Sequence, residues 1–201
     1  MTKIAVIGGG KVGRTLGAAW LRSGHEVRFG SRTPEEVDVP GTADLPSAAA
    51  AWADVVVLTV PGLAAPEVLT GLGSTLDGKI VVDATNRTGA GEMNNLALIA
   101  AVAPGSRACR AFSTVGWEVM ADPTFGTRRA SLFHCGPETA RGTMDGLIAD
   151  VGFDPVWVGE ADQAALIDGL TRLWGTLAIR RGLGRHLALA LLADGPGTPT
   201  R

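Results

Sequence analysis

The chain has 201 residues, of which 18 are basic and 20 acidic, so its formal net charge is −2, and this length suffices for one or two domains whose core needs no disulfide or metal. The nearly balanced charge excludes a large positive field of the kind that binds nucleic acid or anionic membrane, and no apolar run approaches the ~20 residues of a membrane span. The N-terminus lacks the architecture of a signal peptide, and we therefore expect a cytoplasmic protein that binds neither nucleic acid nor membrane.

The first predicted element is a buried strand that ends in glycines. Residues 3–7 form a continuous apolar run, which is typical of a strand covered on both faces of a parallel sheet. Gly8, Gly10 and Gly13 follow with the spacing GxGxxG, and a helical periodicity starts inside this turn. A second strand is predicted at residues 26–29. Strand, glycine turn, helix and strand in this order predict that a helix N-terminus binds the pyrophosphate of a dinucleotide.

The whole glycine turn is expected to contact the dinucleotide. Gly8 permits the tight turn, Gly10 lets the phosphates approach the backbone, and Gly13 lets the helix pack closely on the sheet. The predicted cofactor-binding residues of this turn are Gly8, Gly9, Gly10, Lys11, Val12 and Gly13.

The end of the second strand indicates which dinucleotide binds. An NAD site usually has a carboxylate there, which would repel the 2′-phosphate of NADP. This chain instead has Gly30-Ser31-Arg32-Thr33, in which Arg32 can pair with a phosphate and the two hydroxyls of Ser31 and Thr33 can donate to it. Residues 33–36 have the form of a capping box, so a short helix or turn is predicted to begin at Thr33. We therefore predict NADP(H) as the cofactor, bound by Ser31, Arg32 and Thr33.

Strands and helices alternate along most of the remaining chain. Further strands are predicted at residues 54–60, 79–83, 108–112, 131–135 and 155–158, and further helices at residues 65–72, 94–102, 141–150 and 164–178. This alternation predicts an α/β protein with a doubly wound, mostly parallel sheet, that is, a Rossmann fold in a single compact domain with a C-terminal helix.

Three segments are predicted along the chain. Residues 1–160 form the NADP-binding Rossmann domain. Residues 161–193 form a C-terminal helical segment that packs on this domain or on a dimer partner. Residues 194–201 are rich in Gly, Pro and Thr and are expected to be a disordered tail. The wide apolar stripe of the last helix is compatible with the core and with a dimer contact, and we expect a homodimer.

Two further strand ends are expected at the nicotinamide half of the site. Doubly wound sheets bind ligands at the carboxyl ends of their strands. Val60 and Pro61 end the strand at 54–60, and Thr85 and Asn86 follow the strand at 79–83. All four are predicted to bind the cofactor.

No group for proton transfer stands out in the sequence. The chain has no tyrosine, which removes the Tyr-Lys pair of short-chain dehydrogenases, and Asp54 and Asp83 are interpreted as structural. Cys109 and Cys135 lack metal-site spacing and are interpreted as reduced, partly buried thiols. The histidines are scattered and are interpreted as structural as well: His25, His134 and His186. No catalytic residue and no metal ligand is predicted.

Several segments together resemble the NADPH-dependent reductases of the deazaflavin coenzyme F420 and their bacterial relatives. Three of them are the most specific: Gly-Ser-Arg at residues 30–32, Asp-Ala-Thr-Asn at 83–86, and Ala-Phe-Ser-Thr-Val-Gly-Trp at 111–117. The others lie at residues 7–13, 24–27 and 170–174. The resemblance implies a homodimer whose cleft stacks the nicotinamide on a flat acceptor ring. It also implies an acceptor pocket that includes Ser113, Val115, Trp117 and Met120.

Two positions near this pocket depart from the family pattern. Ser113 stands where relatives usually have Asn, and Arg87 stands where they have Pro. The resemblance favours an NADP(H)-dependent oxidoreductase that transfers hydride between nicotinamide and coenzyme F420 or a similar flat small-molecule acceptor. Two alternatives stay open: an NADPH-dependent biosynthetic reductase of a ketone, imine or flavin, and a non-catalytic NADP(H)-sensing protein. Hydride transfer between two stacked rings depends on positioning more than on a strong acid or base.

Overall fold

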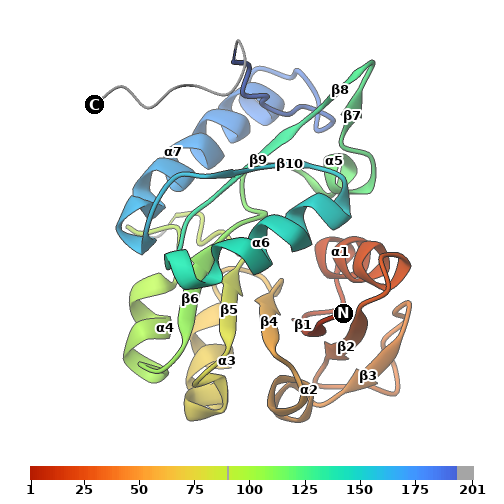
Figure 1. Cartoon of the computed structure of the whole chain (residues 1–201), viewed down its shortest axis with the longest axis vertical. Coiled ribbons are helices and arrows are strands. Elements are labelled where there is room, and N and C mark those ends of the chain that lie inside the picture. Colours follow the sequence, from red (N-terminus) through yellow and green to blue (C-terminus); the bar gives the residue numbers. More distant parts are fainter. Residues whose placement is uncertain (90, 194–201) are drawn as a thin grey trace.

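The computed structural model describes residues 1–89 and 91–193, so the tail predicted at 194–201 lies outside the described residues. A six-stranded parallel sheet with the order β3-β2-β1-β4-β5-β6 forms its centre (Figure 1). Its strands are β1 (Lys3–Ile7), β2 (Glu26–Gly30), β3 (Thr42–Asp44), β4 (Val55–Leu58), β5 (Ile80–Asp83) and β6 (Arg107–Arg110). This order confirms the predicted Rossmann fold, and it places the switch point of the sheet between β1 and β4, where such folds bind ligands.

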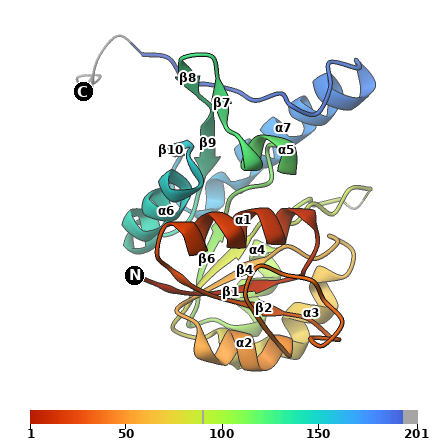
Figure 2. The same cartoon turned by 90° about the vertical axis from the view of Figure 1, so that its right-hand side faces the viewer.

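Helices cover both faces of the sheet (Figure 2). One face carries α1 (Lys11–Arg22), α5 (Trp117–Ala121) and α6 (Glu138–Val151), and the other carries α2 (Pro46–Trp52), α3 (Ala65–Leu72) and α4 (Leu96–Val102). Along β1, Ile4 and Val6 pack on the α1 side while Ala5 and Ile7 pack on the opposite side, all of them buried. Burial on both faces is the reason why the strands read as unbroken apolar runs.

The last two predicted strands do not join the main sheet. β9 (Ser131–His134) and β10 (Asp154–Trp157) pair in parallel with each other, apart from the six-stranded sheet. A single antiparallel bridge between Arg110 and Cys135 connects β6 to the end of β9. A short hairpin, β7 (Thr124–Phe125) with β8 (Arg128–Arg129), precedes β9. Because β9 approaches β6 in the antiparallel direction and at one residue pair only, the parallel sheet ends at β6.

The short helix or turn predicted to begin at Thr33 is a turn, closed by a hydrogen bond from the Glu36 N–H to the Thr33 carbonyl (3.1 Å). Other local details differ from the prediction. Helix α2 was not predicted, although Pro46 stands at its first turn and four alanines follow Ser47. Both cysteines are fully buried rather than partly buried.

The C-terminal helix α7 (Ala164–Gly175) packs on its own chain at the β6 edge of the sheet (Figure 1). It continues as one π-helical turn, Thr176–Arg180, instead of the α-helix expected up to residue 178. The chain then returns along β9, where the Ser131 N–H donates to the Leu189 carbonyl (2.9 Å). The Trp174 indole Nε1 donates a hydrogen bond to the Leu187 carbonyl (2.8 Å) and so holds this returning segment against α7.

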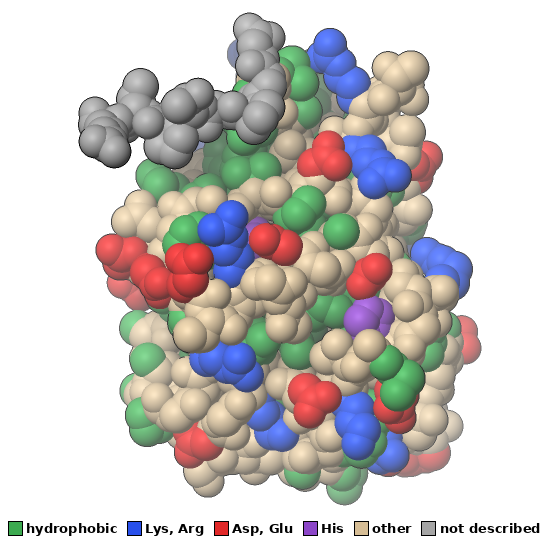
Figure 3. All heavy atoms as spheres, in the orientation of Figure 1, with side chains coloured by type: hydrophobic (Ala, Val, Ile, Leu, Met, Phe, Trp, Pro, Cys, Tyr) green, Lys and Arg blue, Asp and Glu red, His purple; other side chains and the backbone are tan. Residues whose placement is uncertain are grey.

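Charged side chains of both signs are interspersed over the face shown in Figure 3. Within residues 1–89 and 91–193, no helix combines the length and the apolar character needed to cross a membrane.

Candidate cofactor and acceptor site

The glycine turn between β1 and α1 is constrained by close contacts. Gly8 has a φ of +120°, a value that side chains rarely tolerate. A Cβ atom on Gly13 would lie 2.1 Å from the Gly8 carbonyl oxygen and 2.7 Å from the Thr59 hydroxyl oxygen. Glycine at these positions therefore lets α1 start directly against β1 and β4.

The N-terminus of α1 has the features of an anion site. Gly10 caps the helix without a side-chain hydrogen bond, and the first turn contains no acidic residue. A Cβ on Gly10 would meet no atom within 4 Å, so the backbone there borders open space. First-turn N–H groups and the helix dipole favour a negative charge at such a place. The geometry fits the pyrophosphate that the sequence predicts.

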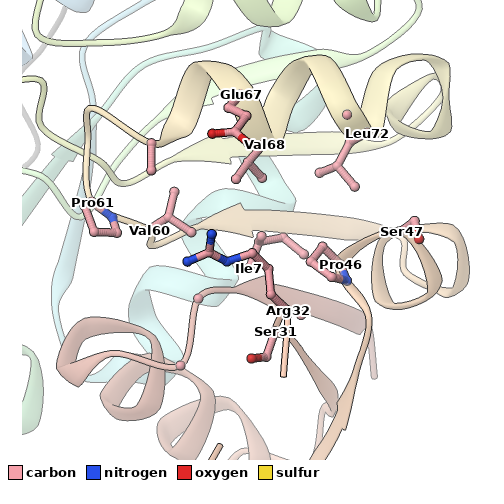
Figure 4. A pocket seen from close by; sticks show the side chains of 15 residues that line it. Ile7, Ser31, Arg32, Pro46, Ser47, Val60, Pro61, Glu67, Val68 and Leu72 are labelled. Carbon is pink, nitrogen blue, oxygen red and sulfur yellow. The ribbon is translucent and has the colours of Figure 1, made fainter. Parts of the chain in front are cut away.

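A cavity of about 480 Å³ opens beside this turn (Figure 4). Six of the predicted cofactor residues line it: Gly8, Gly9, Ser31, Arg32, Val60 and Pro61. The apolar walls come from elements that the sequence reading had not assigned to the site, namely α2 with Pro46 and α3 with Val68 and Leu72. This mixture of apolar walls and a few polar groups is typical of small-molecule and cofactor sites.

Arg32 gives this first cavity its positive charge. Its guanidinium lies inside the cavity in Figure 4, and it makes no ion pair within the described part of the chain. The Ser31 N–H donates to the Asp44 carbonyl of β3 (2.9 Å), and the Ser31 hydroxyl accepts a hydrogen bond from the Thr33 N–H (3.2 Å). Thr33 thus shapes the turn and does not line the cavity. One carboxylate, that of the exposed Glu67 on α3, faces the cavity as well.

A second cavity, of about 690 Å³, lies between the loops after β5 and β6 and helix α7. Five predicted residues line it: Val12, Asn86, Ser113, Val115 and Trp117. Phe112, Met93 and Trp174 add large apolar side chains. Since Gly8 and Gly9 line the first cavity and Val12 lines the second, the start of α1 lies between the two.

Six predicted residues line neither cavity: Gly10, Lys11, Gly13, Thr33, Thr85 and Met120. Met120 is 2% exposed and belongs to the core beneath α1. Thr85 is 3% exposed, and its hydroxyl donates to the Asp83 carboxylate (2.7 Å). The Lys11 Nζ lies 5.0 Å from the centre of the Trp117 ring, and that ring lines the second cavity.

The backbone of Phe112 is strained at the second cavity. Its φ is +58°, which for a bulky residue costs about 1–3 kcal/mol and is found mainly where a site demands it. The ring packs edge-on against Trp20 with 5.8 Å between centroids, and the Trp20 Nε1 donates to the Leu147 carbonyl of α6 (2.9 Å). Packing against α1 and α6 therefore holds the strained loop in place.

The described walls of the second cavity offer hydrogen-bonding groups but no side chain that can act as an acid or base near neutral pH. Among the described residues, its walls contain no carboxylate, histidine, lysine, tyrosine or cysteine. The polar groups are the amide of Asn86, hydroxyls such as those of Ser113 and Thr171, and three arginines. Such walls can position a ring, but they cannot transfer a proton readily at neutral pH.

The histidines and cysteines lie apart from both cavities. The Nε2 of His25 lies 2.8 Å from the Asp150 carboxylate, and the Nε2 of His134 lies 2.7 Å from the Asp145 carboxylate. His186 stacks on the ring of Phe125 with 4.6 Å between centroids. Burial raises the pKa of the two thiols, to about 12 for Cys109 and about 11 for Cys135, so neither is a nucleophile at neutral pH.

A buried arginine, which sequence reasoning missed, organises the floor of the second cavity. Arg110 is completely buried, and its guanidinium lies 3.4 Å from the Asp83 carboxylate and 3.0 Å from the Asp168 carboxylate of α7. It also donates to the Asn86 Oδ1 (2.7 Å), while the Asn86 Nδ2 donates to the Ser113 carbonyl (3.1 Å). This network fixes the amide of Asn86 and ties α7 to the sheet.

A signal for this cluster was present in the sequence. Arg110 lies inside the strand predicted at residues 108–112, and a buried charge must be paired. Asp83 was correctly interpreted as structural, since it accepts hydrogen bonds from the Thr85 and Asn95 N–H groups (3.0 and 2.6 Å). What the sequence could not indicate was the third member, Asp168, which lies 58 positions away from Arg110.

Comparison with known proteins confirms the resemblance noted in the sequence. Residues 3–87 match the family described as NADP oxidoreductase, coenzyme F420-dependent. Metalloreductase STEAP3 of Rattus norvegicus is 27% identical over 187 residues, which cover 84% of this chain; the chain spans 36% of that relative's length.

Solved structures share the fold at low identity. A protein of Arthrobacter sp. FB24, proposed to be an F420-dependent NADP reductase, superposes with a TM-score of 0.83 and 24% identity, covering 96% of this chain and 100% of that one. A reductive aminase of Aspergillus terreus in complex with NADPH and ethyl levulinate superposes with a TM-score of 0.70 and 22% identity, covering 90% of this chain and 63% of that one. The family match thus covers the front part of the chain, residues 3–87, and the solved structures share its Rossmann fold.

Proposed function

We propose that the chain catalyses hydride transfer between NADP(H) and a flat acceptor ring, with coenzyme F420 as the preferred acceptor. One observation carries this proposal: beside the dinucleotide turn lies a cavity that combines aromatic walls with the absence of an acid or base among its described residues. Hydride transfer to a ketone leaves an alkoxide, which needs a proton donor in the site. Hydride transfer to a deazaflavin leaves a negative charge that is delocalised over the ring and can be protonated afterwards by water, so the step needs mainly the alignment of the two rings.

In this proposal, the residues at the first cavity bind the phosphates of the cofactor, and those at the second cavity bind the reacting rings. The nicotinamide of NADPH supplies the hydride. The N-terminus of α1 holds the pyrophosphate, and Ser31 and Arg32 hold the 2′-phosphate. Val12 and Trp117 line the second cavity, where the rings bind. Asn86 lines it too, and a hydrogen bond from Arg110 fixes the orientation of its amide.

Arg32 is expected to select NADPH over NADH. Arg32→Ala should weaken NADPH binding by ~1.5–3 kcal/mol, the scale of a charge-assisted hydrogen bond, and leave NADH binding nearly unchanged. Fluorescence titration with both cofactors measures this. Arg22→Ala serves as control, because Arg22 is an exposed arginine at the end of α1 outside the first cavity. Equal losses for the two cofactors would refute the role of Arg32.

The acceptor is tested by anaerobic turnover with NADPH and purified coenzyme F420, followed at the deazaflavin absorbance. Turnover is expected, and Trp117→Leu should raise the KM for F420 with little change in NADPH affinity. Trp52→Leu is the matched control, since Trp52 lies on α2 outside both cavities. No turnover with F420 would refute the proposal.

Other outcomes would point to the alternative functions. Reduction of a ketone, imine or flavin without F420 turnover would favour the biosynthetic reductase. The fold shared with the NADPH-bound reductive aminase is compatible with that function. NADPH binding without oxidation by any acceptor would favour a sensing role.

We also propose that a second copy of the chain covers the exposed apolar face around α7. Leu166 and Leu173 on α7 are 56% and 44% exposed, and Ile179 and Leu183 after it are 55% and 63% exposed. Several large apolar side chains left exposed on and just after one helix favour a subunit interface there. Sedimentation velocity is expected to show a dimer, and Leu166→Glu with Leu173→Glu to shift it to monomer; a wild-type monomer would overturn this proposal.

A further inference from the structure

The side-chain amide of Asn86 is held in one orientation at the wall of the second cavity. Its Oδ1 accepts a hydrogen bond from the Arg110 guanidinium (2.7 Å), and its Nδ2 donates to the Ser113 carbonyl (3.1 Å). Because an arginine can only donate and a carbonyl can only accept, these two partners permit this orientation and exclude the flipped one. The hydrogen bonds therefore determine which end of the amide is the donor.

One N–H of this amide is left for a ligand. The Nδ2 carries two hydrogens, and the Ser113 carbonyl accepts one of them. Within residues 1–89 and 91–193, the Nδ2 has no second acceptor. Asn86 is partly exposed, and it lines the second cavity. A ring that enters the cavity therefore meets a hydrogen-bond donor whose orientation is already set.

Arg110 makes this donor rigid and strong. Its buried guanidinium is held by the carboxylates of Asp83 and Asp168 and by the backbone carbonyls of Asp83 and Thr85. A hydrogen bond from a cation to the Oδ1 draws electron density out of the Asn86 amide, and this polarisation strengthens its N–H as a donor. Such a fixed group needs no reorganisation when charge develops beside it.

The other neutral donors of the cavity are engaged or buried. The Thr171 hydroxyl donates to the Ile167 carbonyl (3.0 Å), and Ser113 is 2% exposed. The three arginines in the walls belong to exposed residues with long, flexible side chains. Asn86 is therefore the donor that the fold itself orients.

Hydride transfer creates a charge that such a donor can stabilise. The C–H bond at the nicotinamide C4 breaks, and the hydrogen moves with its electron pair to a carbon of the acceptor ring. The nicotinamide is thereby oxidised, and the reduced acceptor ring gains one negative charge until water supplies a proton. A hydrogen bond to the ring lowers the energy of this charged state and of the transition state that leads to it.

We propose that Asn86 is a catalytic residue and that its second Nδ2–H donates to an oxygen or nitrogen of the acceptor ring, where it stabilises the charge brought by the hydride. This inference rests on the proposed function and deepens it, because it names the group that promotes the reaction in a cavity whose described walls have no acid or base.

Single-turnover kinetics with NADPH and coenzyme F420 test this role. Asn86→Asp keeps the shape of the side chain and removes both N–H donors, and Asn86→Ala removes them without adding charge. In both variants the hydride-transfer rate is expected to fall about tenfold to a hundredfold, no more than the loss of one oxyanion-hole donor usually costs, because the charge is delocalised. NADPH deuterated at the transferred position should still react more slowly, which shows that hydride transfer is the step observed.

Binding and stability measurements separate this role from a structural one. Fluorescence titration should show nearly unchanged affinities of both Asn86 variants for NADP⁺ and F420. Asn94→Ala is the matched control, because the Asn94 amide donates to Asp168 in the same buried network (2.8 Å) but lies outside both cavities. This control should lower the urea midpoint and leave the hydride-transfer rate unchanged.

Three results would overturn the inference: an unchanged rate in both Asn86 variants, an equal rate loss in Asn94→Ala, or a loss confined to NADPH affinity, which would make Asn86 a cofactor-binding residue only. Failure of the proposed function is distinguishable from these results. In that case the wild-type protein itself would reduce no flat ring acceptor with NADPH, and the inference would fall with it.

Discussion

Removing the buried guanidinium at the floor of the second cavity should destabilise the whole fold. In the variant Arg110→Met, a side chain of similar length replaces one that is 0% exposed. The carboxylates of Asp83 and Asp168, which it contacts at 3.4 and 3.0 Å, would remain buried without their counter-charge. Breaking a buried ion pair in this way costs about 3–5 kcal/mol in the free energy of unfolding.

Urea unfolding followed by tryptophan fluorescence measures this loss. Arg28→Met is the matched control, because Arg28 pairs with Asp44 at a similar distance, 3.1 Å, but with both side chains partly exposed, 38% and 29%. A surface pair of this kind contributes only about 0–1 kcal/mol. If Arg110→Met lowered the free energy of unfolding no more than the control does, the buried network would not contribute to holding α7 on the sheet. Adding Asp168→Asn to Arg110→Met should recover part of the loss, since it removes one unpaired carboxylate.

Three further predictions concern the turn, the thiols and one histidine. Gly13→Ala should cost about 1–3 kcal/mol of unfolding free energy and weaken NADPH binding, because its Cβ would lie 2.1 Å from the Gly8 carbonyl oxygen; unchanged urea midpoint and affinity would contradict this. In the folded protein, Cys109 and Cys135 should not react with a disulfide reagent at pH 8, since burial raises the pKa of the thiols to about 12 and about 11, whereas both should react in guanidinium chloride. Burial lowers the pKa of His134 below its ordinary 6.5, so the unfolded state binds the proton more readily and the free energy of unfolding should fall as the pH drops below about 6.5. Urea unfolding between pH 5 and pH 8 measures this dependence, and His134→Gln should flatten it. An equal slope in the variant would refute the prediction.

Much of the fold was accessible from the sequence because its signals are local. The run at residues 3–7, the glycine spacing after it and the helical periodicity that follows lie within one short segment, and each reports backbone conformation directly. The same holds for Ser31 and Arg32, which were predicted to bind the cofactor and which line the first cavity directly after β2. Helix α2 was missed even though Pro46 and its alanines provide a local signal.

The second cavity depends on contacts that no local pattern encodes. Its walls come from α1, from the loops after β5 and β6 and from the C-terminal segment. The pairing of Arg110 with Asp168 across 58 positions brings the last of these to the sheet. The same packing buries Met120 in the core and turns Thr85 toward Asp83, so neither residue reaches the cavity.

The sequence by itself thus determined the parallel α/β fold, the glycine turn and the arginine that lines the first cavity, because strand burial, glycine spacing and strand-end residues act within a few positions of the chain. Only the tertiary structure decided which side chains share the second cavity and that Arg172, Arg180 and Arg185 are among them. These properties arise when segments far apart in sequence pack together, and they are set by where α7 meets the sheet.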